Sequence, residues 1–214
     1  MITETLTGTL LVDDIEYNEY PPAEQLCKAM KRQWANKLIQ RGLIRIRKLE
    51  YYRKLENDVL GDPNDGRGLY HIEGHPMQMD SANDIYAWCL SLPEISNGRL
   101  LAISAQGKYD CTVVIHDMEK LLVRIRSYVQ KNYRGLRLHC GYVLYDRGTE
   151  VSKETLDTQK FHFNVFQKAS RFQDDREYRV SITNCTSKRY KKDYLDLLIG
   201  ECKDIISIQP LPKN

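Results

Sequence analysis

Short segments of strand-like sequence follow one another along most of this chain, and only two stretches between them have a helical period. The strand-like segments lie at residues 5–12, 43–47, 85–92, 99–104, 109–116, 139–146, 176–183, 194–200 and 204–211. They are rich in β-branched and other apolar residues, and turn residues bound them. Strands in succession favour neighbouring antiparallel or mixed pairing over a doubly wound sheet. The pattern therefore predicts a single α+β domain over residues 1–214, with a mixed or antiparallel sheet flanked by two main helices.

The two helical stretches are amphipathic. From about Ala23 to Arg41, apolar residues recur every three or four positions, and Gly42 is placed to end the helix. From Asp117 to about Asn132 the same period returns, and Asp117 is a favourable N-cap. Both stretches predict helices that pack one apolar face on the sheet.

Two polar segments are predicted to be loops. Residues 57–83 lose the apolar period and are rich in Gly, Asp and Asn, which makes this the longest expected loop. Irregular loops longer than about 12–15 residues inside a compact domain are usually functional or disordered, so we expect a functional loop here. Residues 147–160 are expected to form a surface loop.

Charge and cysteine content narrow the function classes. The chain has 32 Lys and Arg against 29 Asp and Glu, a formal net charge of +3, which argues against a strongly electrostatic nucleic-acid or membrane binder. No apolar run approaches the roughly 20 residues that span a bilayer, and no signal-peptide pattern opens the sequence. The six cysteines are scattered without a C-x-x-C pair, which favours reduced thiols and a cytoplasmic location.

Tyrosine is unusually frequent, with 14 Tyr against 4 Phe and 2 Trp. A tyrosine ring packs like phenylalanine but brings a hydroxyl that needs a partner, which suits ligand clefts and interfaces. The tyrosines of interest fall into two groups. Tyr51, Tyr52, Tyr70 and Tyr178 lie near Arg and Glu, whereas Tyr128, Tyr133, Tyr190 and Tyr194 accompany basic stretches.

Several common sites are excluded by their missing partners. His71, Glu73 and His75 could converge on a metal ion, but neither P-C-x-x-C nor H-E-x-x-H accompanies them, so we expect no metal. The glycines of residues 61–74 match neither the P-loop nor the dinucleotide fingerprint. No G-x-S-x-G elbow supports acyl-transfer hydrolysis.

A resemblance to a known family rests on four ordered segments: GLIRIRKLEYYRKLE, GRG leading to EG, YAWCLS, and FQKASRFQDDREYRV. Their order and spacing, within residues 38–180, resemble a group of uncharacterised bacterial proteins related to abortive-infection proteins of the AbiGi type. The resemblance implies a phage-defence or toxin-like effector with a cognate antitoxin or sensor. It brings no established catalytic activity.

The segment REYRV is similar to the glutamate strand of the ADP-ribosyltransferase superfamily. This similarity implies an ADP-ribosyltransferase-like fold, NAD as the substrate, and a protein or nucleic acid as the acceptor. It makes Glu177 the expected catalytic residue, whose carboxylate would stabilise the oxocarbenium charge as nicotinamide leaves.

NAD chemistry also needs an aromatic ring to stack on nicotinamide and cations to bind the pyrophosphate. Tyr51, Tyr52 and Tyr70 are the candidate rings, and Arg45, Arg53 and Arg67 are the candidate cations. The substrate-binding set that we expect is Tyr51, Tyr52, Arg53, Arg67, Tyr70, Glu73 and Arg179. The chain departs from the superfamily in its first strand, which has neither His nor Arg. Either Tyr17 or Tyr20 takes that place, or transferase activity is lacking.

Plainer interpretations stand beside these. Glu177 also fits a surface ion pair with Arg176, Arg179 or Lys168 on a solvated strand face. Arg53 and Glu56 also suit a helical surface pair, and only one of Tyr51 and Tyr52 can face the core. Arg67 and Glu73 equally suit ordering of the loop.

Three functions are therefore weighed. The first is the NAD-dependent effector, and the second is a non-catalytic module that senses a nucleotide or a partner. The third is a nucleic-acid binder that uses the basic stretches at 120–137 and 188–192.

Overall fold

The structure is a computed structural model that describes residues 2–4, 10–12, 15–17, 25–55, 59, 61–79, 84–145, 161–186, 190 and 192–212. Its strands are β1 (Ile2–Glu4), β2 (Leu10–Val12), β3 (Ile15–Tyr17), β4 (Leu26–Met30), β5 (Leu43–Lys48), β6 (Gly68–Ile72), β7 (His75–Met79), β8 (Ile85–Ser91), β9 (Cys111–Ile115), β10 (Leu136–Tyr142), β11 (Glu177–Asn184), β12 (Tyr194–Leu198) and β13 (Ile206–Gln209). Its helices are α1 (Arg32–Arg41), α2 (Leu49–Arg53), α3 (Asn97–Gly107), α4 (Met118–Asn132) and the 3-10 helices η1 (Phe161–Phe166) and η2 (Ser170–Asp175).

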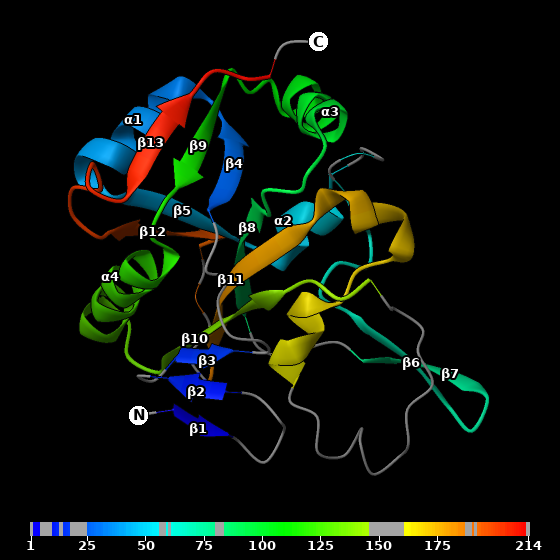
Figure 1. Cartoon of the computed structure of the whole chain (residues 1–214). Helices are drawn as coiled ribbons and strands as arrows, with labels where there is room; N and C mark the ends of the chain where they lie inside the picture. Colours follow the sequence, from blue (N-terminus) through cyan, green and yellow to red (C-terminus); the bar gives the residue numbers. More distant parts are fainter. Residues whose placement is uncertain are drawn as a thin grey trace.

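Eleven of the described strands form one sheet in the order β1-β2-β3-β10-β11-β8-β4-β9-β13, with β5 and β12 branching from β8 (Figure 1). Strands β3 and β10 pair in parallel, whereas the other described pairs are antiparallel. The predicted α+β class with a mixed sheet is therefore confirmed. The predicted strand over 43–47 is confirmed as β5, and the predicted helix from Asp117 is confirmed as α4, with the Asp117 side chain accepting from the Lys120 N–H at 2.8 Å.

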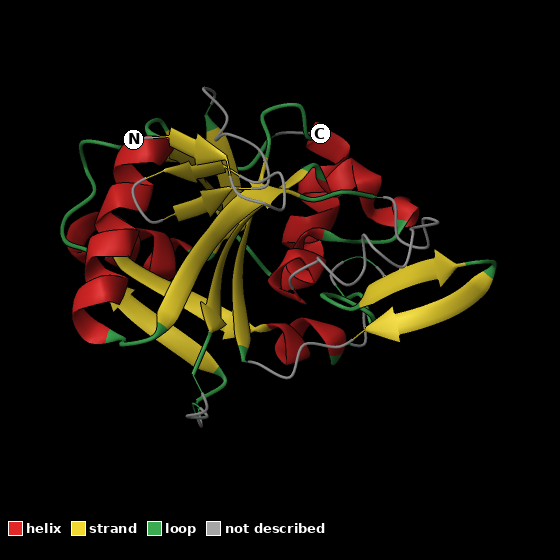
Figure 2. Ribbon diagram, turned by 90° about the horizontal axis from the view of Figure 1, so that it is seen from below, coloured by secondary structure: helices red, strands yellow, loops and turns green. Residues whose placement is uncertain are grey.

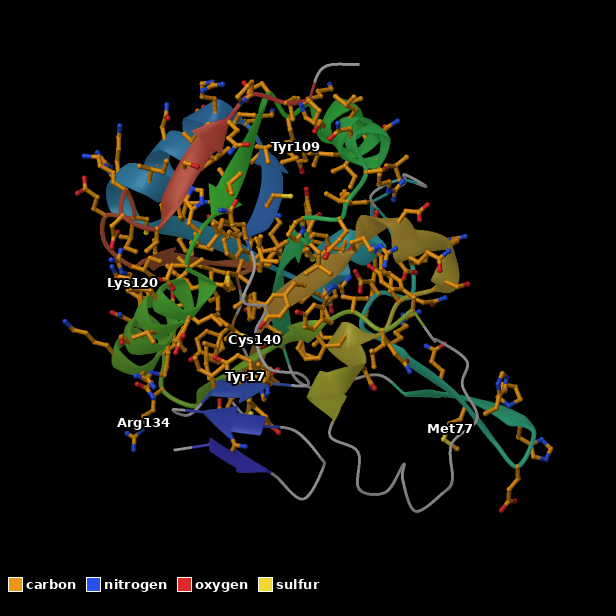
Figure 3. All side chains as sticks on the ribbon, viewed as in Figure 1. Tyr17, Met77, Tyr109, Lys120, Arg134 and Cys140 are labelled. Carbon is orange, nitrogen blue, oxygen red and sulfur yellow. The ribbon has the colours of Figure 1, made fainter. Side chains whose placement is uncertain are left out.

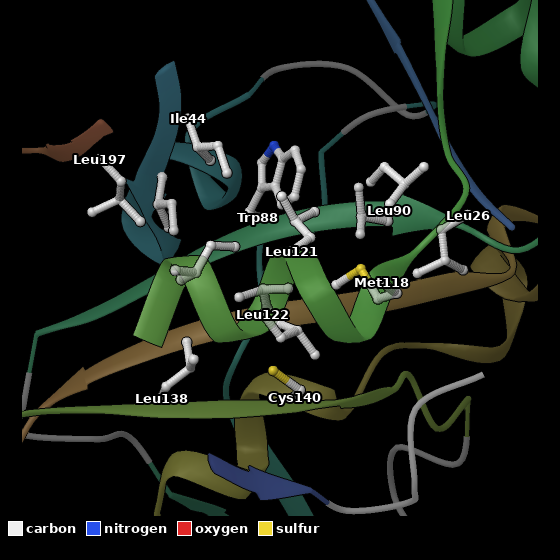
Figure 4. Close-up of a cluster of buried hydrophobic side chains, with 14 of the residues drawn as sticks. Leu26, Ile44, Trp88, Leu90, Met118, Leu121, Leu122, Leu138, Cys140 and Leu197 are labelled. Atoms are coloured by element: carbon white, nitrogen blue, oxygen red, sulfur yellow. The ribbon is translucent and has the colours of Figure 1, made fainter. Parts of the chain in front are cut away.

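One face of the sheet carries the main apolar core. Tyr86, Trp88 and Leu90 of β8 point to this face, since side chains alternate along a strand. They pack with apolar residues of α1 and α4, and Figure 4 shows Leu121 and Leu122 of α4 against Trp88 and Leu90. These two helices cover the face.

The opposite face is covered as well. Ala87 of β8 packs with Leu49 of α2 and with Val165 of η1. Ala29 of β4 packs with Leu100 of α3. The sheet is therefore enclosed between two layers, and polar side chains on this second face are removed from water.

The sheet forks at β8. On the edge of β8 opposite β11, β5 pairs with Tyr86 and Ala87, whereas β4 pairs with Ser91. Between these pairings, residues 88–90 have no strand partner on that edge within the described sheet. Side chains reach two carbonyls there: Lys28 Nζ donates to Cys89 O at 2.6 Å and Tyr52 Oη donates to Ala87 O at 3.1 Å. We call this divergence of β4 and β5 the fork.

The structure corrects three predictions about secondary structure. Residues 99–104, expected as a strand, lie in α3, whose N-cap Ser96 accepts from the Arg99 N–H at 3.1 Å. The helix expected from Ala23 to Arg41 is β4 followed by α1, because the spacing of Leu26 and Met30 suits a strand as well as a helix. Three α-helices of ten or more residues are described, not two.

The segment expected as a loop over 57–83 contains a β-hairpin. Strands β6 and β7 pair over their whole length and are joined by Glu73 and Gly74, both with positive φ. This is the two-residue turn that suits strand twist. The hairpin projects from the body of the molecule in Figure 2, and Met77 lies far from the core in Figure 3. The loop expected at 147–160 lies outside the described residues.

Candidate active site

Strand β11 places Glu177 and Arg179 side by side on the second face of the sheet. The Arg179 side chain is fully buried, and its guanidinium donates to Glu177 Oε2 at 2.8 Å. It also donates to both carboxylate oxygens of Asp65, at 2.6 and 3.1 Å, and to Val165 O at 2.6 Å. This bidentate pairing fixes the orientation of the guanidinium.

Lys168 continues the chain of charges. Its Nζ donates to the other oxygen of Glu177 and, at 2.8 Å, to Asp175 Oδ2. Asp175 also accepts from Arg99 Nε of α3 at 2.7 Å. We call Asp65, Arg99, Lys168, Asp175, Glu177 and Arg179 the charge network. Its three acids and three bases alternate, so their formal charges cancel.

A tight turn brings Asp65 to the sheet from far along the chain. Its N–H donates to Asp62 O at 2.9 Å, and the Asn64 N–H donates to the Asp62 carboxylate at 3.0 Å. Asp and Asn favour such turns because their side chains bond to nearby backbone. Arg53 Nε of α2 donates to Asp65 O at 2.6 Å, which connects the turn to α2.

The network keeps Glu177 ionised. Burial alone would raise the pKa of Glu177, but the charges of Arg179 and Lys168 and their hydrogen bonds outweigh it and hold the pKa below its usual range. Burial would lower the pKa of Lys168, whereas Glu177 and Asp175 raise it above the ordinary lysine value. At neutral pH Glu177 is therefore a fixed negative charge, and Lys168 a fixed positive one.

A cavity of about 300 Å³ opens beside the network. Its polar wall includes Asp65, Lys168, Asp175, Glu177 and Arg179. The remaining lining residues are Lys28, Ala29, Tyr51, Tyr52, Leu55, Val59, Cys89, Leu90, Ser91, Leu100, Ile103, Gln106, Gly107 and Tyr109. We call this cavity the first chamber. Its mixed lining is typical of small-molecule sites.

A second chamber of about 370 Å³ adjoins the first. Both chambers are lined by Lys28, Tyr51, Tyr52, Gly107 and Tyr109. Trp88 lines the second chamber and Cys89 the first, and these neighbours point to opposite faces of β8. The two chambers therefore meet at the fork.

Lys28 occupies the junction of the chambers. Its Nζ bonds to Cys89 O and lies 5.9 Å from the centre of the Trp88 ring. Burial lowers the pKa of Lys28, although the charge of Glu177 partly opposes this. Burial, with the nearby charge of Glu177, also raises the pKa of the Cys89 thiol to about 12, so Cys89 is a neutral thiol rather than a nucleophilic thiolate.

Four of the expected site residues line the first chamber: Tyr51, Tyr52, Glu177 and Arg179. Glu177 is only 8% exposed, so its interpretation as a member of a solvated face is wrong. The layer of α2, α3 and the 3-10 helices covers that face. Tyr52 is hydrogen-bonded to β8, whereas Tyr51 is 38% exposed, which confirms that only one of the pair faces inward.

The other expected residues lie elsewhere. Arg53 donates to the backbone of the turn that carries Asp65. Arg67 donates to Asn64 Oδ1 at 3.3 Å within that turn. Glu73 is exposed at the end of the β6–β7 hairpin. Tyr70 lies in β6, but its side chain is outside the described part, as is Glu56.

Tyr17 does not substitute for the missing first-strand residue at the cavity. Its side chain is buried in the main core, and β3 pairs it with Cys140 of β10. Figure 3 shows the two labelled residues close together. Tyr20 lies outside the described residues.

Sequence reasoning missed several residues of the site. Lys28 was assigned to a helix, and Asp65 is one of several acids in a segment expected as loop. Arg99 lies in a segment expected as a strand, and Asp175 lies just before the strand expected at 176–183. The one available signal was the DPNDGRG segment, whose turn chemistry predicts a tight bend but not its partner 114 residues away in sequence.

Three tyrosines of the second group, Tyr128, Tyr133 and Tyr190, form a cluster of their own, whereas the Tyr194 ring lies 3.8 Å from the guanidinium of Arg45 in the second chamber. The rings of Tyr128 and Tyr133 are 6.3 Å apart, and those of Tyr133 and Tyr190 are 6.2 Å apart. Tyr178 joins neither the site nor this group, because it points into the main core and packs edge-on with Tyr142.

Fold and site together define an α+β protein with a two-chambered cavity beside a buried charge network. Comparison with protein-family models, with curated proteins and with solved structures gave no match to this chain. Among the described residues, no cluster of His, Cys, Asp and Glu could hold a metal ion, and no helix there is long and apolar enough to cross a membrane. The six cysteines are all free thiols.

Proposed function

We propose that this protein is an effector of a phage-defence or toxin-like system that consumes NAD in the first chamber, by ADP-ribosyl transfer or NAD cleavage. One observation carries the proposal: an ionised glutamate, Glu177, lies in the wall of a cavity that also contains tyrosine rings. A positive charge develops on the ribose as nicotinamide leaves, and a preorganised anion stabilises it in a site shielded from water.

Glu177, the two cations that contact it and two tyrosine rings each have a role in the proposed reaction. Glu177 supplies the negative charge, and Lys168 and Arg179 hold its two oxygens in place. A carboxylate has about four acceptor positions, and these two bonds leave positions that can accept from a ribose hydroxyl. Tyr51 and Tyr109, which line both chambers, provide flat surfaces for an aromatic ring.

Glu177 acts in this proposal as an electrostatic group and not as a base. Its low pKa makes it a poor proton acceptor near neutral pH. Loss of nicotinamide from NAD needs no proton transfer to Glu177, because the leaving group departs as a neutral molecule. Water or a nucleophile of a protein or nucleic-acid acceptor then completes the reaction.

The test is incubation of the purified chain with NAD, alone and with candidate protein and nucleic-acid acceptors. Nicotinamide release is measured for the wild type, for Glu177→Gln and for the matched control Glu119→Gln, an exposed glutamate of α4. We expect Glu177→Gln to lower the rate about a hundredfold or more, a typical loss for one preorganised electrostatic group. Circular dichroism checks that the variant is folded. No nicotinamide and no adduct under any condition would overturn the proposal.

A second candidate is a module that binds a nucleotide or a partner without turnover. Both oxygens of Glu177 are already engaged, and the network holds the Asp65 turn, η2 and α3 to the sheet. A network that only holds these segments in place needs no catalytic role for Glu177, as the second candidate requires. Tight NAD binding without turnover, unchanged in Glu177→Gln, favours this candidate over the enzyme.

A further inference from the structure

The second chamber is strongly basic, unlike the first. Lys28, Lys31, Arg45 and Arg47 line it, and among the described residues of its lining none is acidic. Aromatic side chains supply much of the remaining wall: Trp34, Tyr51, Tyr52, Trp88 and Tyr109. This combination of cations and rings differs from the balanced charge network of the first chamber.

Among the described ion pairs, one of the four basic side chains of the second chamber, Arg45, is paired with a carboxylate. Arg45 is paired with Asp196 of β12 through two hydrogen bonds of 2.8 Å. Arg47 instead lies over the Tyr51 ring at 4.1 Å. Within the part of the chain that the structure describes, no carboxylate lies within ion-pair distance of Arg47, Lys31 or Lys28.

The fold holds these cations in one place for a structural reason. Lys28 comes from β4 and Arg47 from β5, the two strands that diverge at the fork. Lys31 and Trp34 come from the start of α1, which connects these strands. The N-terminus of α1 is not itself the anion site, because the Arg32 N–H already donates to Asp110 Oδ1 at 2.6 Å.

Clustered cations repel one another and are stabilised by an anion in their midst. Phosphate suits this chamber better than a single carboxylate, since it offers several acceptor oxygens to groups from three elements. The rings of Tyr51 and Tyr109, shared with the first chamber, could stack on a flat base.

We infer that the second chamber binds the phosphate groups of a nucleoside phosphate, with Arg47, Lys31 and Lys28 as the cations that contact them. The inference deepens the proposed function and rests on it for the nucleoside part of the ligand. The phosphate part rests on the cations alone. A ligand that spans both chambers would place its phosphates at the fork, between the Glu177 wall and Trp34.

The test measures binding of ADP, inorganic pyrophosphate and adenosine to the full chain by calorimetry at low salt. We expect ADP to bind more tightly than pyrophosphate, and adenosine to bind least. Arg47→Gln should weaken the binding of ADP and of pyrophosphate about tenfold or more, with little effect on the binding of adenosine. The control Arg137→Gln removes an exposed arginine of β10 and should leave all three affinities unchanged. Lys31→Gln, at an exposed position, provides a second variant that does not disturb the core.

Failure of the inference can be told apart from failure of the proposed function. If ADP binds no better than adenosine, or Arg47→Gln and Lys31→Gln both behave like Arg137→Gln, the phosphate site is wrong even if NAD is consumed. If NAD is not consumed but ADP binding depends on Arg47, the phosphate site stands and the NAD reaction is wrong. Pyrophosphate that binds as tightly as ADP would overturn the nucleoside part.

Discussion

Replacement of Arg179 by methionine should be among the most destabilising single changes in this protein. The guanidinium is fully buried and makes four hydrogen bonds, to Glu177, Asp65 and Val165. Methionine fills much of the same space but leaves the Asp65 carboxylate without its bidentate partner. Glu177 retains its hydrogen bond from Lys168, so it loses less stabilisation than Asp65 does.

The magnitude follows from removal of one partner of a buried ion pair, which costs about 3–5 kcal/mol. The upper part of that range applies here, because Asp65 loses two hydrogen bonds and Val165 O loses its donor as well. Domains typically have about 5–15 kcal/mol of stability, so the variant should still fold.

Urea denaturation followed by tryptophan fluorescence gives the free energy of unfolding. The double variant Asp65→Asn with Arg179→Met removes the buried carboxylate that would lack a partner. Its loss of unfolding free energy should therefore be smaller than the sum of the two single losses by about 1–3 kcal/mol. Arg137→Met, at an exposed site on β10, should change stability by no more than about 0.5 kcal/mol. A cost below about 1 kcal/mol for Arg179→Met, or strict additivity in the cycle, would refute the reasoning.

Two further predictions concern pH and backbone conformation. Because the folded-state pKa of Glu177 is held below its unfolded value, its contribution to stability is complete above about pH 4.3 and is lost as pH falls toward the folded pKa. The free energy of unfolding should thus fall less steeply below pH 5 in Glu177→Gln than in the wild type, and parallel curves would contradict this. Gly42→Ala should cost more than about 1 kcal/mol, since Gly42 has φ +62° and an added Cβ would lie 2.1 Å from Gly200 O. Gly98→Ala in α3, where an added Cβ meets nothing within 4 Å, should be neutral or stabilising in thermal denaturation, and equal effects of the two changes would argue against a role for backbone strain.

The parts of the fold that the sequence predicts well are those with a long, clear period or a cap. Helix α4 has fifteen residues with a buried stripe and an Asp cap, and β5 alternates Ile44 and Ile46 with two arginines. The short apolar run at 99–104 fits either a strand or a buried helical turn, and the Ser96 cap together with packing of Leu100 against Ala29 of β4 decides for the helix. The local sequence pattern predicts secondary structure least well where tertiary contacts set the conformation.

The site was predictable only in part, for a similar reason. Glu177 and Arg179 were singled out from their motif, but alternation along a strand could not show that both faces of β11 are covered. The partners Asp65 and Lys168 come from irregular segments whose place relative to the sheet depends on long-range contacts. Lys28 was placed on a helix, and its role at the junction became evident only with the fork in the sheet.

The fork also leaves the two arms of the sheet with few direct hydrogen bonds to β8. A continuous ladder of hydrogen bonds would hold β4 and β5 at a fixed angle, but the two strands join β8 through only three residue pairs in the described sheet. The arm formed by β4, β9 and β13 and the arm formed by β5 and β12 are instead held together by α1, which packs on β5, β9 and β13 (Figure 1). The width of the second chamber is therefore set by how α1 packs on both arms. Because Ala35 and Leu38 of α1 belong to the main apolar core, this width depends on the packing of that core.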